Sequence, residues 1–219
     1  MASSAAAAPA ATYVLYLVTD AGLSRGRSHL SIVEAAIRGG VTTVQYREKN
    51  ASTRCMIEEA TELLRLCRAA GVPFIVNDRL DVALAVDADG VHVGQDDMPA
   101  ALARRLLGRN KTLGVSAGST EEARKAVDDG ADYIGASPVF STPTKPDAPP
   151  PLGIEGLRRM THAVEIPVVA IGGITEGNAA AMIEAGAAGI AVVSAIVAAE
   201  DVEAAARALR AVVEKVRMR

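Results

Sequence analysis

Short apolar runs alternate with longer amphipathic stretches along almost the whole chain. Several of the runs are apolar throughout, as expected for parallel strands that are buried on both faces. We expect eight strands, at residues 13–19, 43–47, 74–77, 90–94, 112–116, 133–136, 168–171 and 189–193. The helical periodicity predicts helices at 28–38, 52–70, 79–86, 98–107, 119–129, 153–163, 176–185 and 200–217.

A glycine separates most of these helices from the strand that follows, as Gly71, Gly130 and Gly186 do. Glycine just past a helix end is the usual left-handed cap, and its repetition is typical of alternating β/α architecture. Eight β/α units in 219 residues predict one α/β domain, a single (β/α)8 TIM barrel over residues 12–219. The alternative is an open doubly wound sheet, which would have fewer strands and a glycine fingerprint loop after the first one.

Composition limits the partners and the compartment. Half of the residues are hydrophobic and only 3% are aromatic, so we expect a core of Ala, Val, Leu and Ile. A net charge of −3 without a basic block argues against nucleic acid and anionic membranes as partners. Cys55 and Cys67 lie on one predicted helix, too far apart to bond, and we expect reduced packing residues in a cytoplasmic protein. The Ala-rich residues 1–11 lack the charges of a targeting segment and predict a disordered tail.

One connection differs from the others. Six of the ten prolines lie between residues 137 and 151, which excludes a helix or a central strand there. The segment follows the sixth strand, on the face where barrel active sites are built. We therefore expect a mobile Pro-rich flap at 138–152. It offers Thr142 and Thr144 as hydroxyl donors and Lys145 as a point charge for phosphate.

Polar residues also stand where the second to fifth strands end. Gln45, Arg47 and Lys49 alternate, so they share one face and suit a polyanion, although a charged surface strand end is the alternative. Asn77-Asp78 and Gln95-Asp96-Asp97 end the next two strands. Paired carboxylates without His or Cys suit Mg²⁺, and ordinary helix N-caps are the alternative. Ser116 ends the fifth strand, and the three histidines (His29, His92 and His162) are expected in packing or on the surface.

The seventh strand stops at Gly172-Gly173, and the eighth stops at Ser194-Ala195. Bare backbone N–H groups before a helix expected from residue 176 suit a phosphate, as after strands 7 and 8 of a (β/α)8 barrel. The alternative is a tight turn that needs two small residues.

Taken in order, these motifs resemble the thiamine-phosphate synthase family over about residues 13–210. The motifs are Gln45-Tyr46-Arg47-Glu48-Lys49, Asn77-Asp78, Gly90 to Asp97, Gly114-Val115-Ser116, Thr142-Pro143-Thr144-Lys145, and Ile171 to Ile174 with Val193-Ser194. The resemblance implies a transferase that condenses 4-amino-2-methyl-5-hydroxymethylpyrimidine diphosphate with carboxythiazole phosphate. The products would be thiamine phosphate, diphosphate and CO2.

The resemblance also implies residue roles. Asp78 and Asp97 would bind Mg²⁺, the expected cofactor. Arg47, Lys49, Ser116 and Lys145 would be catalytic and would bind the pyrimidine diphosphate together with Gln45 and Asn77. The residues for the thiazole phosphate would be Thr142, Thr144, Gly173, Val193 and Ser194.

Three other functions compete with this one. A related thiazole tautomerase would lack the metal aspartates and would use a His near Gly118. A Schiff-base aldolase would use Lys49 or Lys145 as its nucleophile. A non-catalytic barrel would bind a phosphorylated ligand without turnover. Homo-oligomerisation is left open by the sequence.

Overall fold

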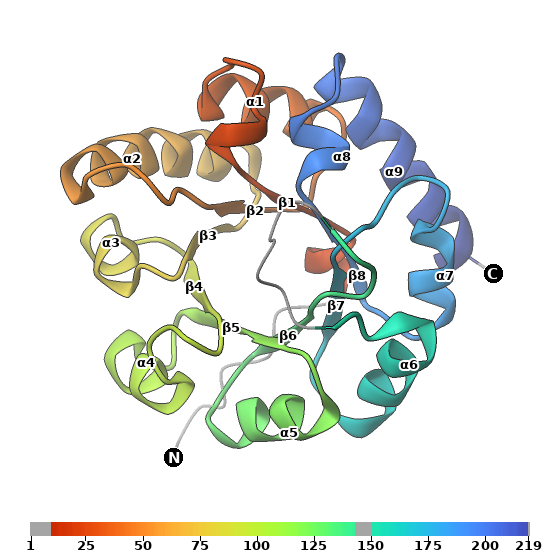
Figure 1. The fold of residues 1–219 in the computed structure, drawn as a ribbon. Coiled ribbons are helices and arrows are strands. Elements are labelled where there is room, and N and C mark those ends of the chain that lie inside the picture. The colour runs from red at the N-terminus through yellow and green to blue at the C-terminus, as the bar shows by residue number, and fades with distance from the viewer. Residues whose placement is uncertain (1–9, 143–149, 219) are drawn as a thin grey trace.

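A computed structural model describes residues 10–142 and 150–218 and shows eight parallel strands in one closed barrel (Figure 1). Each strand pairs with the next, and the last closes on the first through Leu15 opposite Ile190. The strands are β1 Leu15–Val18, β2 Thr43–Tyr46, β3 Phe74–Asn77, β4 Gly90–Val93, β5 Thr112–Ala117, β6 Tyr133–Ala136, β7 Val168–Ile171 and β8 Gly189–Val192. The predicted (β/α)8 barrel is therefore confirmed, and the open sheet is excluded.

Helices surround the barrel as an outer ring (Figure 1). They are α1 His29–Arg38, α2 Thr53–Ala70, α3 Leu80–Ala85, α4 Ala100–Leu107, α5 Thr120–Asp128, α6 Gly153–Ala163, α7 Ala179–Glu184, α8 Ser194–Val197 and α9 Val202–Arg217. The long α9 packs against both α1 and α7 and so completes the ring. Helix α8 is not predicted by the sequence pattern, because four residues are too few to show a helical period.

Helix ends follow local chemistry. Ser52 caps α2 and Ser119 caps α5, each by accepting a hydrogen bond from a backbone N–H three residues on. Such a cap stabilises a helix by about 1 kcal/mol. Gly71 ends α2 with a left-handed φ of 68°, as the sequence pattern predicted.

The core has two layers. The outer layer, between sheet and helices, is built mainly from Ala, Val, Leu and Ile, as expected. The barrel interior differs, because it is filled by a cluster that contains Tyr13, Tyr16 and Tyr133. The rings of Tyr13 and Tyr133 lie 4.7 Å apart between centroids. The expected aliphatic core is therefore incomplete for the interior, where the three tyrosines pack with Val18, Ile75, Val169 and Ala191.

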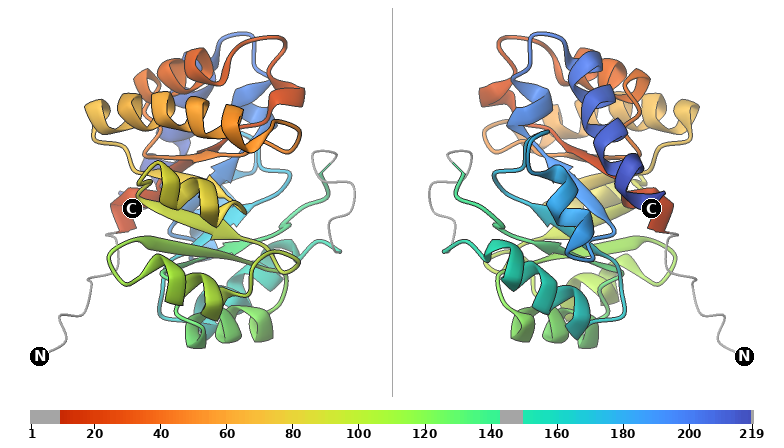
Figure 2. Two further views of the ribbon diagram at one scale, coloured as in Figure 1. Left: turned by 90° about the vertical axis from the view of Figure 1, so that its left-hand side faces the viewer. Right: turned by 90° about the vertical axis from the view of Figure 1, so that its right-hand side faces the viewer.

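The N-terminal end of the barrel carries a 3-10 helix, Ala10–Tyr13, on the opposite side from the β6–α6 connection (Figure 2). Residues 1–9 of the expected tail lie outside the described residues, while Ala10 and Ala11 belong to this helix. Within 10–142 and 150–218, none of the helices combines the length and apolar character that a membrane crossing requires.

The two cysteines differ in environment. Cys67 is buried in α2, and burial raises the pKa of its thiol to about 12. Cys55 is exposed at the start of the same helix, so the prediction that it is a packing residue is wrong.

Candidate active site

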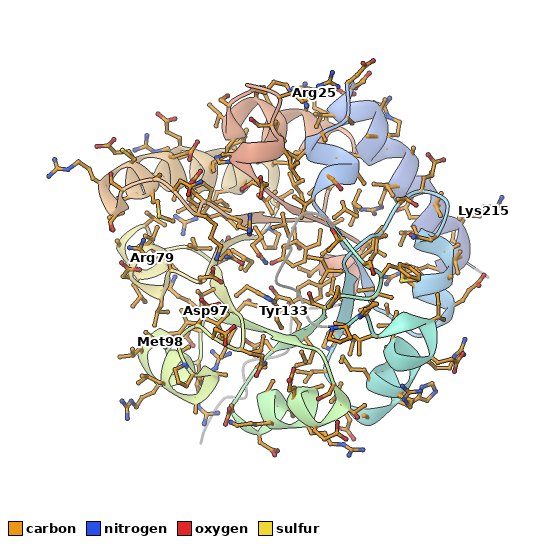
Figure 3. The ribbon with its side chains drawn as sticks, viewed as in Figure 1. Arg25, Arg79, Asp97, Met98, Tyr133 and Lys215 are labelled. Atoms are coloured by element: carbon orange, nitrogen blue, oxygen red, sulfur yellow. The ribbon has the colours of Figure 1, made fainter. Side chains whose placement is uncertain are left out.

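A cavity of about 380 Å³ opens at the carboxyl ends of the strands. Figure 3 places Tyr133 near the barrel axis and Asp97 towards β4, and both residues line this cavity. Every predicted site residue within the described ranges also lines it, namely Gln45, Arg47, Lys49, Asn77, Asp78, Asp97, Ser116, Thr142, Gly173, Val193 and Ser194. Thr144 and Lys145 lie outside the described residues.

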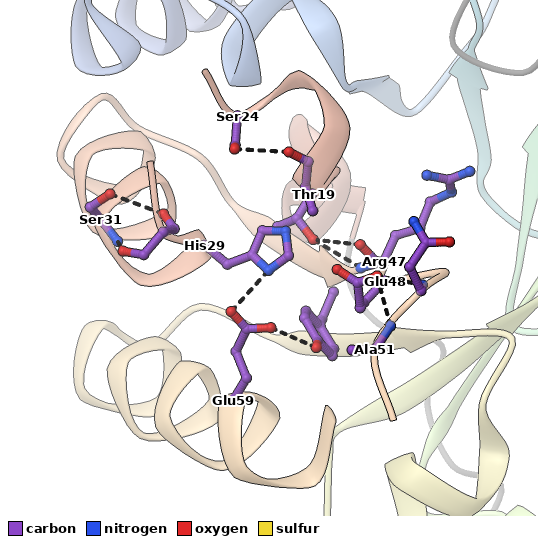
Figure 4. Close-up of polar contacts among 12 residues, drawn as sticks. Thr19, Ser24, His29, Ser31, Arg47, Glu48, Ala51 and Glu59 are labelled. Carbon is purple, nitrogen blue, oxygen red and sulfur yellow. Dashed lines mark hydrogen bonds and ion pairs between the residues drawn. The ribbon is translucent and has the colours of Figure 1, made fainter. Parts of the chain in front are cut away.

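The cationic end of β2 is held by its neighbours. Thr19 accepts a hydrogen bond of 2.9 Å from the Arg47 backbone N–H (Figure 4). The Arg47 guanidinium pairs with Asp20, a residue to which the sequence pattern assigns no role. Lys49 Nζ lies 2.5 Å from Asp78 Oδ2. Both cations therefore face the cavity while each is paired with a carboxylate.

Asp78 and Asp97 form a pair of neighbouring carboxylates. Asp97 accepts a 2.7 Å hydrogen bond from the Gly94 N–H. Desolvation, reinforced by the adjacent Asp78 carboxyl, raises the pKa of Asp97. Neither residue caps the following helix, since Arg79 and Pro99 occupy those positions, and the N-cap alternative is therefore wrong.

This pair fits a hard divalent cation. The donors are carboxylate oxygens, and their mutual repulsion is of the kind that a cation relieves. In the described part of the chain, no group of three or more His, Cys, Asp and Glu side chains could hold a metal. A Mg²⁺ ion here would therefore need further oxygen ligands from a substrate or from water.

The Gly172-Gly173 turn differs from its prediction. The helix expected from residue 176 begins only at Ala179, so the two glycines do not lie at a helix N-terminus. Their φ angles are 103° and 64°, and a Cβ on Gly173 would lie 2.7 Å from Phe140 Cβ. The small-residue alternative therefore explains why both positions are glycine, and Gly173 still faces the cavity.

The base of the predicted flap rests on this turn. Phe140 N–H donates to Gly172 O at 3.1 Å, and Val139 N–H donates to Ile171 O at 2.9 Å. The end of the loop is held to its beginning, because Leu152 N–H donates to Pro138 O at 2.9 Å. Thr142 is thereby brought to the cavity, while the remainder of the flap, 143–149, lies outside the described residues.

A hydrogen-bonded chain crosses the interior beneath the cavity. Gln45 Nε2 donates to Tyr16 OH at 3.0 Å, and Tyr16 OH lies 2.8 Å from Tyr133 OH. Tyr133 OH lies 2.8 Å from His92 Nδ1, and His92 Nε2 lies 2.9 Å from Ser116 Oγ. The chain therefore joins two predicted site residues, Gln45 and Ser116, through three buried side chains.

His92, Tyr16 and Tyr133 were missed as residues of the cavity, which all three line. His92 alternates with Val91 and Val93, and this alternation could have placed it on the opposite, inward face of the strand. Burial lowers the pKa of His92 to about 4. Of the other two histidines, His29 lies buried 3.0 Å from Glu59 (Figure 4) and His162 is exposed, as expected for packing and surface residues.

Comparison with known proteins relates this barrel to one group. A family model described as "Thiamine monophosphate synthase" matches residues 15–196. The chain is 70% identical to a thiamine-phosphate synthase of Chloroflexus aurantiacus, over 91% of this chain and 92% of that protein. It is 54% identical to one of Moorella thermoacetica, over 93% and 97% of the two chains. A solved thiamine phosphate pyrophosphorylase from Pyrococcus furiosus aligns with a TM-score of 0.87 at 45% identity, covering 94% of this chain and 98% of that one.

Proposed function

Because this chain belongs to the thiamine-phosphate synthase family, we propose that its cavity seats both substrates of that reaction side by side. The chain is a transferase of thiamine biosynthesis. It joins 4-amino-2-methyl-5-hydroxymethylpyrimidine diphosphate to carboxythiazole phosphate and releases diphosphate and CO2. The tautomerase alternative is not supported, because the relatives are named for the synthase and both aspartates are present.

One observation carries the proposal. The residues implied for the pyrimidine diphosphate and those implied for the thiazole phosphate line the same cavity wherever the structure describes them. The first group lies on or just after β2, β3 and β5, and the second lies just after β7 and β8 and at the flap base. Two reactants held at neighbouring places react with a much smaller entropic cost than in solution.

The diphosphate end lies at Arg47, Lys49 and Asn77, and we assign Lys145 of the flap to it as well, while Ser116 faces the pyrimidine of the same substrate. Negative charge grows on the diphosphate as its bond to the pyrimidine methylene breaks, so cations aimed at it lower the barrier. Asp78 and Asp97 would hold Mg²⁺, which supplies further positive charge to the leaving diphosphate. Release of Lys49 from Asp78 would then free its ammonium for the substrate.

The thiazole phosphate end lies at Thr142, Gly173, Val193 and Ser194, with Thr144 of the flap assigned beside them. Ser194 is the first residue of the short helix α8. A short extra helix after strand 8 is a frequent phosphate-binding element of this fold. These residues would hold the thiazole so that its ring nitrogen attacks the pyrimidine methylene as the diphosphate departs.

We propose small phosphorylated molecules as partners, with neither nucleic acid nor membrane. A cytoplasmic location agrees with two free cysteines. The aldolase alternative is disfavoured at Lys49, because its ammonium is ion-paired and half exposed rather than desolvated.

Turnover with and without metal tests the proposal. The purified protein should form thiamine phosphate from both substrates with Mg²⁺ and should stop when the metal is chelated. Asp78→Asn should lower the rate roughly a hundredfold or more, because it removes a ligand of the ion that stabilises the leaving group. Asp81→Asn is the matched control, since Asp81 of α3 pairs with Arg79 and does not line the cavity. Full activity of Asp78→Asn would refute the metal assignment.

A further inference from the structure

We propose that His92 is a positioning residue that fixes the Ser116 hydroxyl as a hydrogen-bond donor towards the pyrimidine substrate. The inference rests on the proposed function for the identity of that substrate. It rests on the geometry of the interior for everything else.

The direction of the chain is set at its Gln45 end. The Gln45 Nε2 amide can only donate, so Tyr16 OH accepts at 3.0 Å. Among the described residues, Tyr133 OH is then the remaining partner for the single proton of Tyr16. Tyr16 is fully buried, and a hydroxyl proton left without an acceptor there would be costly. Tyr16 therefore donates to Tyr133.

The tautomer of His92 is set by the hydrogen bond that Tyr133 makes to it. Tyr133 OH has accepted from Tyr16, so its own proton goes to His92 Nδ1, 2.8 Å away. Because Nδ1 accepts this hydrogen bond, it carries no proton, so the imidazole is neutral and has a single N–H proton. That proton is on Nε2 and is donated to Ser116 Oγ at 2.9 Å. Ser116 Oγ thus accepts a hydrogen bond from His92, and its own proton is free to point into the cavity that it lines.

Two glycines show that the interior is shaped around these side chains. A Cβ on Gly114 would lie 2.4 Å from His92 Nδ1 and 2.3 Å from Tyr133 OH. A Cβ on Gly135 would lie 3.0 Å from His92 Cε1. Gly114 pairs with His92 across β4 and β5, and Gly135 pairs with Ser116 across β5 and β6. Strand neighbours without side chains therefore leave the imidazole and the phenol the room that their hydrogen bonds require.

The consequence is a preference for one kind of ligand atom. A Ser116 hydroxyl that is held as a donor matches the lone pair of a pyrimidine ring nitrogen, and it does not match an N–H group. Without the hydrogen bond from His92, the Ser116 hydroxyl could rotate and accept a hydrogen bond from the substrate. His92 would then affect recognition of the pyrimidine and leave the thiazole phosphate, at Gly173 and Ser194, unaffected.

Paired substitutions separate positioning from packing. His92→Gln can keep an N–H near the place of Nε2, whereas the shorter His92→Asn can reach only the Tyr133 side. His92→Asn should raise the KM for the pyrimidine diphosphate about two- to tenfold, the range for one neutral hydrogen bond. The KM for the thiazole phosphate should stay within about twofold of the wild-type value. His92→Gln should restore most of the loss, and in a Ser116→Ala background His92→Asn should add no further loss.

The opposite results would overturn the inference. Equal rises in both KM values, or additive effects of His92→Asn and Ser116→Ala, would show a merely structural role. The tautomer is measured independently by ¹⁵N NMR of the His92 imidazole in the wild-type protein, where an Nε2–H ring is expected and an Nδ1–H ring would contradict the argument. This spectrum decides the case even where a variant does not fold. Failure of the wild-type protein to form thiamine phosphate would refute the proposed function instead, and the NMR result would stand apart from it.

Discussion

Replacing His92 with Gln should remove a defined part of the acid sensitivity of the fold. Burial lowers the pKa of this imidazole from 6.5 to about 4, and the charge of Asp97 opposes the shift. The unfolded chain therefore binds more protons than the folded one between these values. Stability that is fully present above the unfolded pKa is lost as the pH falls towards the folded pKa.

The size of the effect follows from the gap between the two values. A gap of about 2.5 pKa units, at 1.36 kcal/mol each, corresponds to about 3 kcal/mol, most of it lost by pH 4. About 2 kcal/mol should be lost between pH 7 and pH 5. For a chain of this size, that loss should lower the melting temperature by roughly 4–8 °C.

Urea unfolding of the wild type and His92→Gln at pH 7, 6 and 5 measures the effect. Carboxylates elsewhere titrate in both proteins, so the difference between the two unfolding free energies isolates His92. That difference should move by about 2 kcal/mol in favour of the variant between pH 7 and pH 5. His162→Gln, on the exposed surface of α6, is the control and should leave the pH dependence unchanged. Parallel curves for the wild type and His92→Gln would refute the argument from burial.

Three further predictions concern the metal, the Gly-Gly turn and the cysteines. Mg²⁺ together with diphosphate, each at a hundred times its dissociation constant, should raise the melting temperature of the wild type by roughly 5–10 °C. Asp97→Asn should abolish this rise. An equal rise in the variant would place the metal elsewhere. Gly173→Ala should raise the KM for the thiazole phosphate more than the KM for the pyrimidine diphosphate. Residue 173 has a left-handed φ, and a Cβ there would collide with Phe140. The reverse order of the two KM changes in steady-state kinetics would contradict the division of the cavity. A thiol reagent should label Cys55 in the folded protein and Cys67 only on unfolding, as mass spectrometry of the modified peptides would show; labelling of folded Cys67 would contradict its burial.

The barrel could be predicted because its signals are local. Strands that are buried on both faces have continuous apolar sequences, and glycines such as Gly71 mark the helix ends. Once the barrel was inferred, every strand end had to meet at one mouth, which brought Arg47, Asp78 and Gly173 to a single cavity.

The interior could not be predicted in the same way. An apolar run shows that a strand is buried, but it does not show which side chains meet across the barrel. The contact of Tyr16 with Tyr133 depends on strand register and links residues 117 positions apart. The start of α7 was misplaced for a related reason, because the Asn178 side chain bonds the Thr175 N–H and the Gly173 carbonyl and holds this stretch as a turn.

The central claim is that one cavity receives both phosphorylated substrates and joins them. The most direct measurement is a product balance, in which thiamine phosphate, diphosphate and CO2 are quantified together after the purified protein has acted on both substrates with Mg²⁺. We predict that the three products appear in equal amounts and that none forms when either substrate is omitted. Diphosphate or CO2 released without thiamine phosphate, or a thiazole phosphate that is only isomerised, would contradict the account.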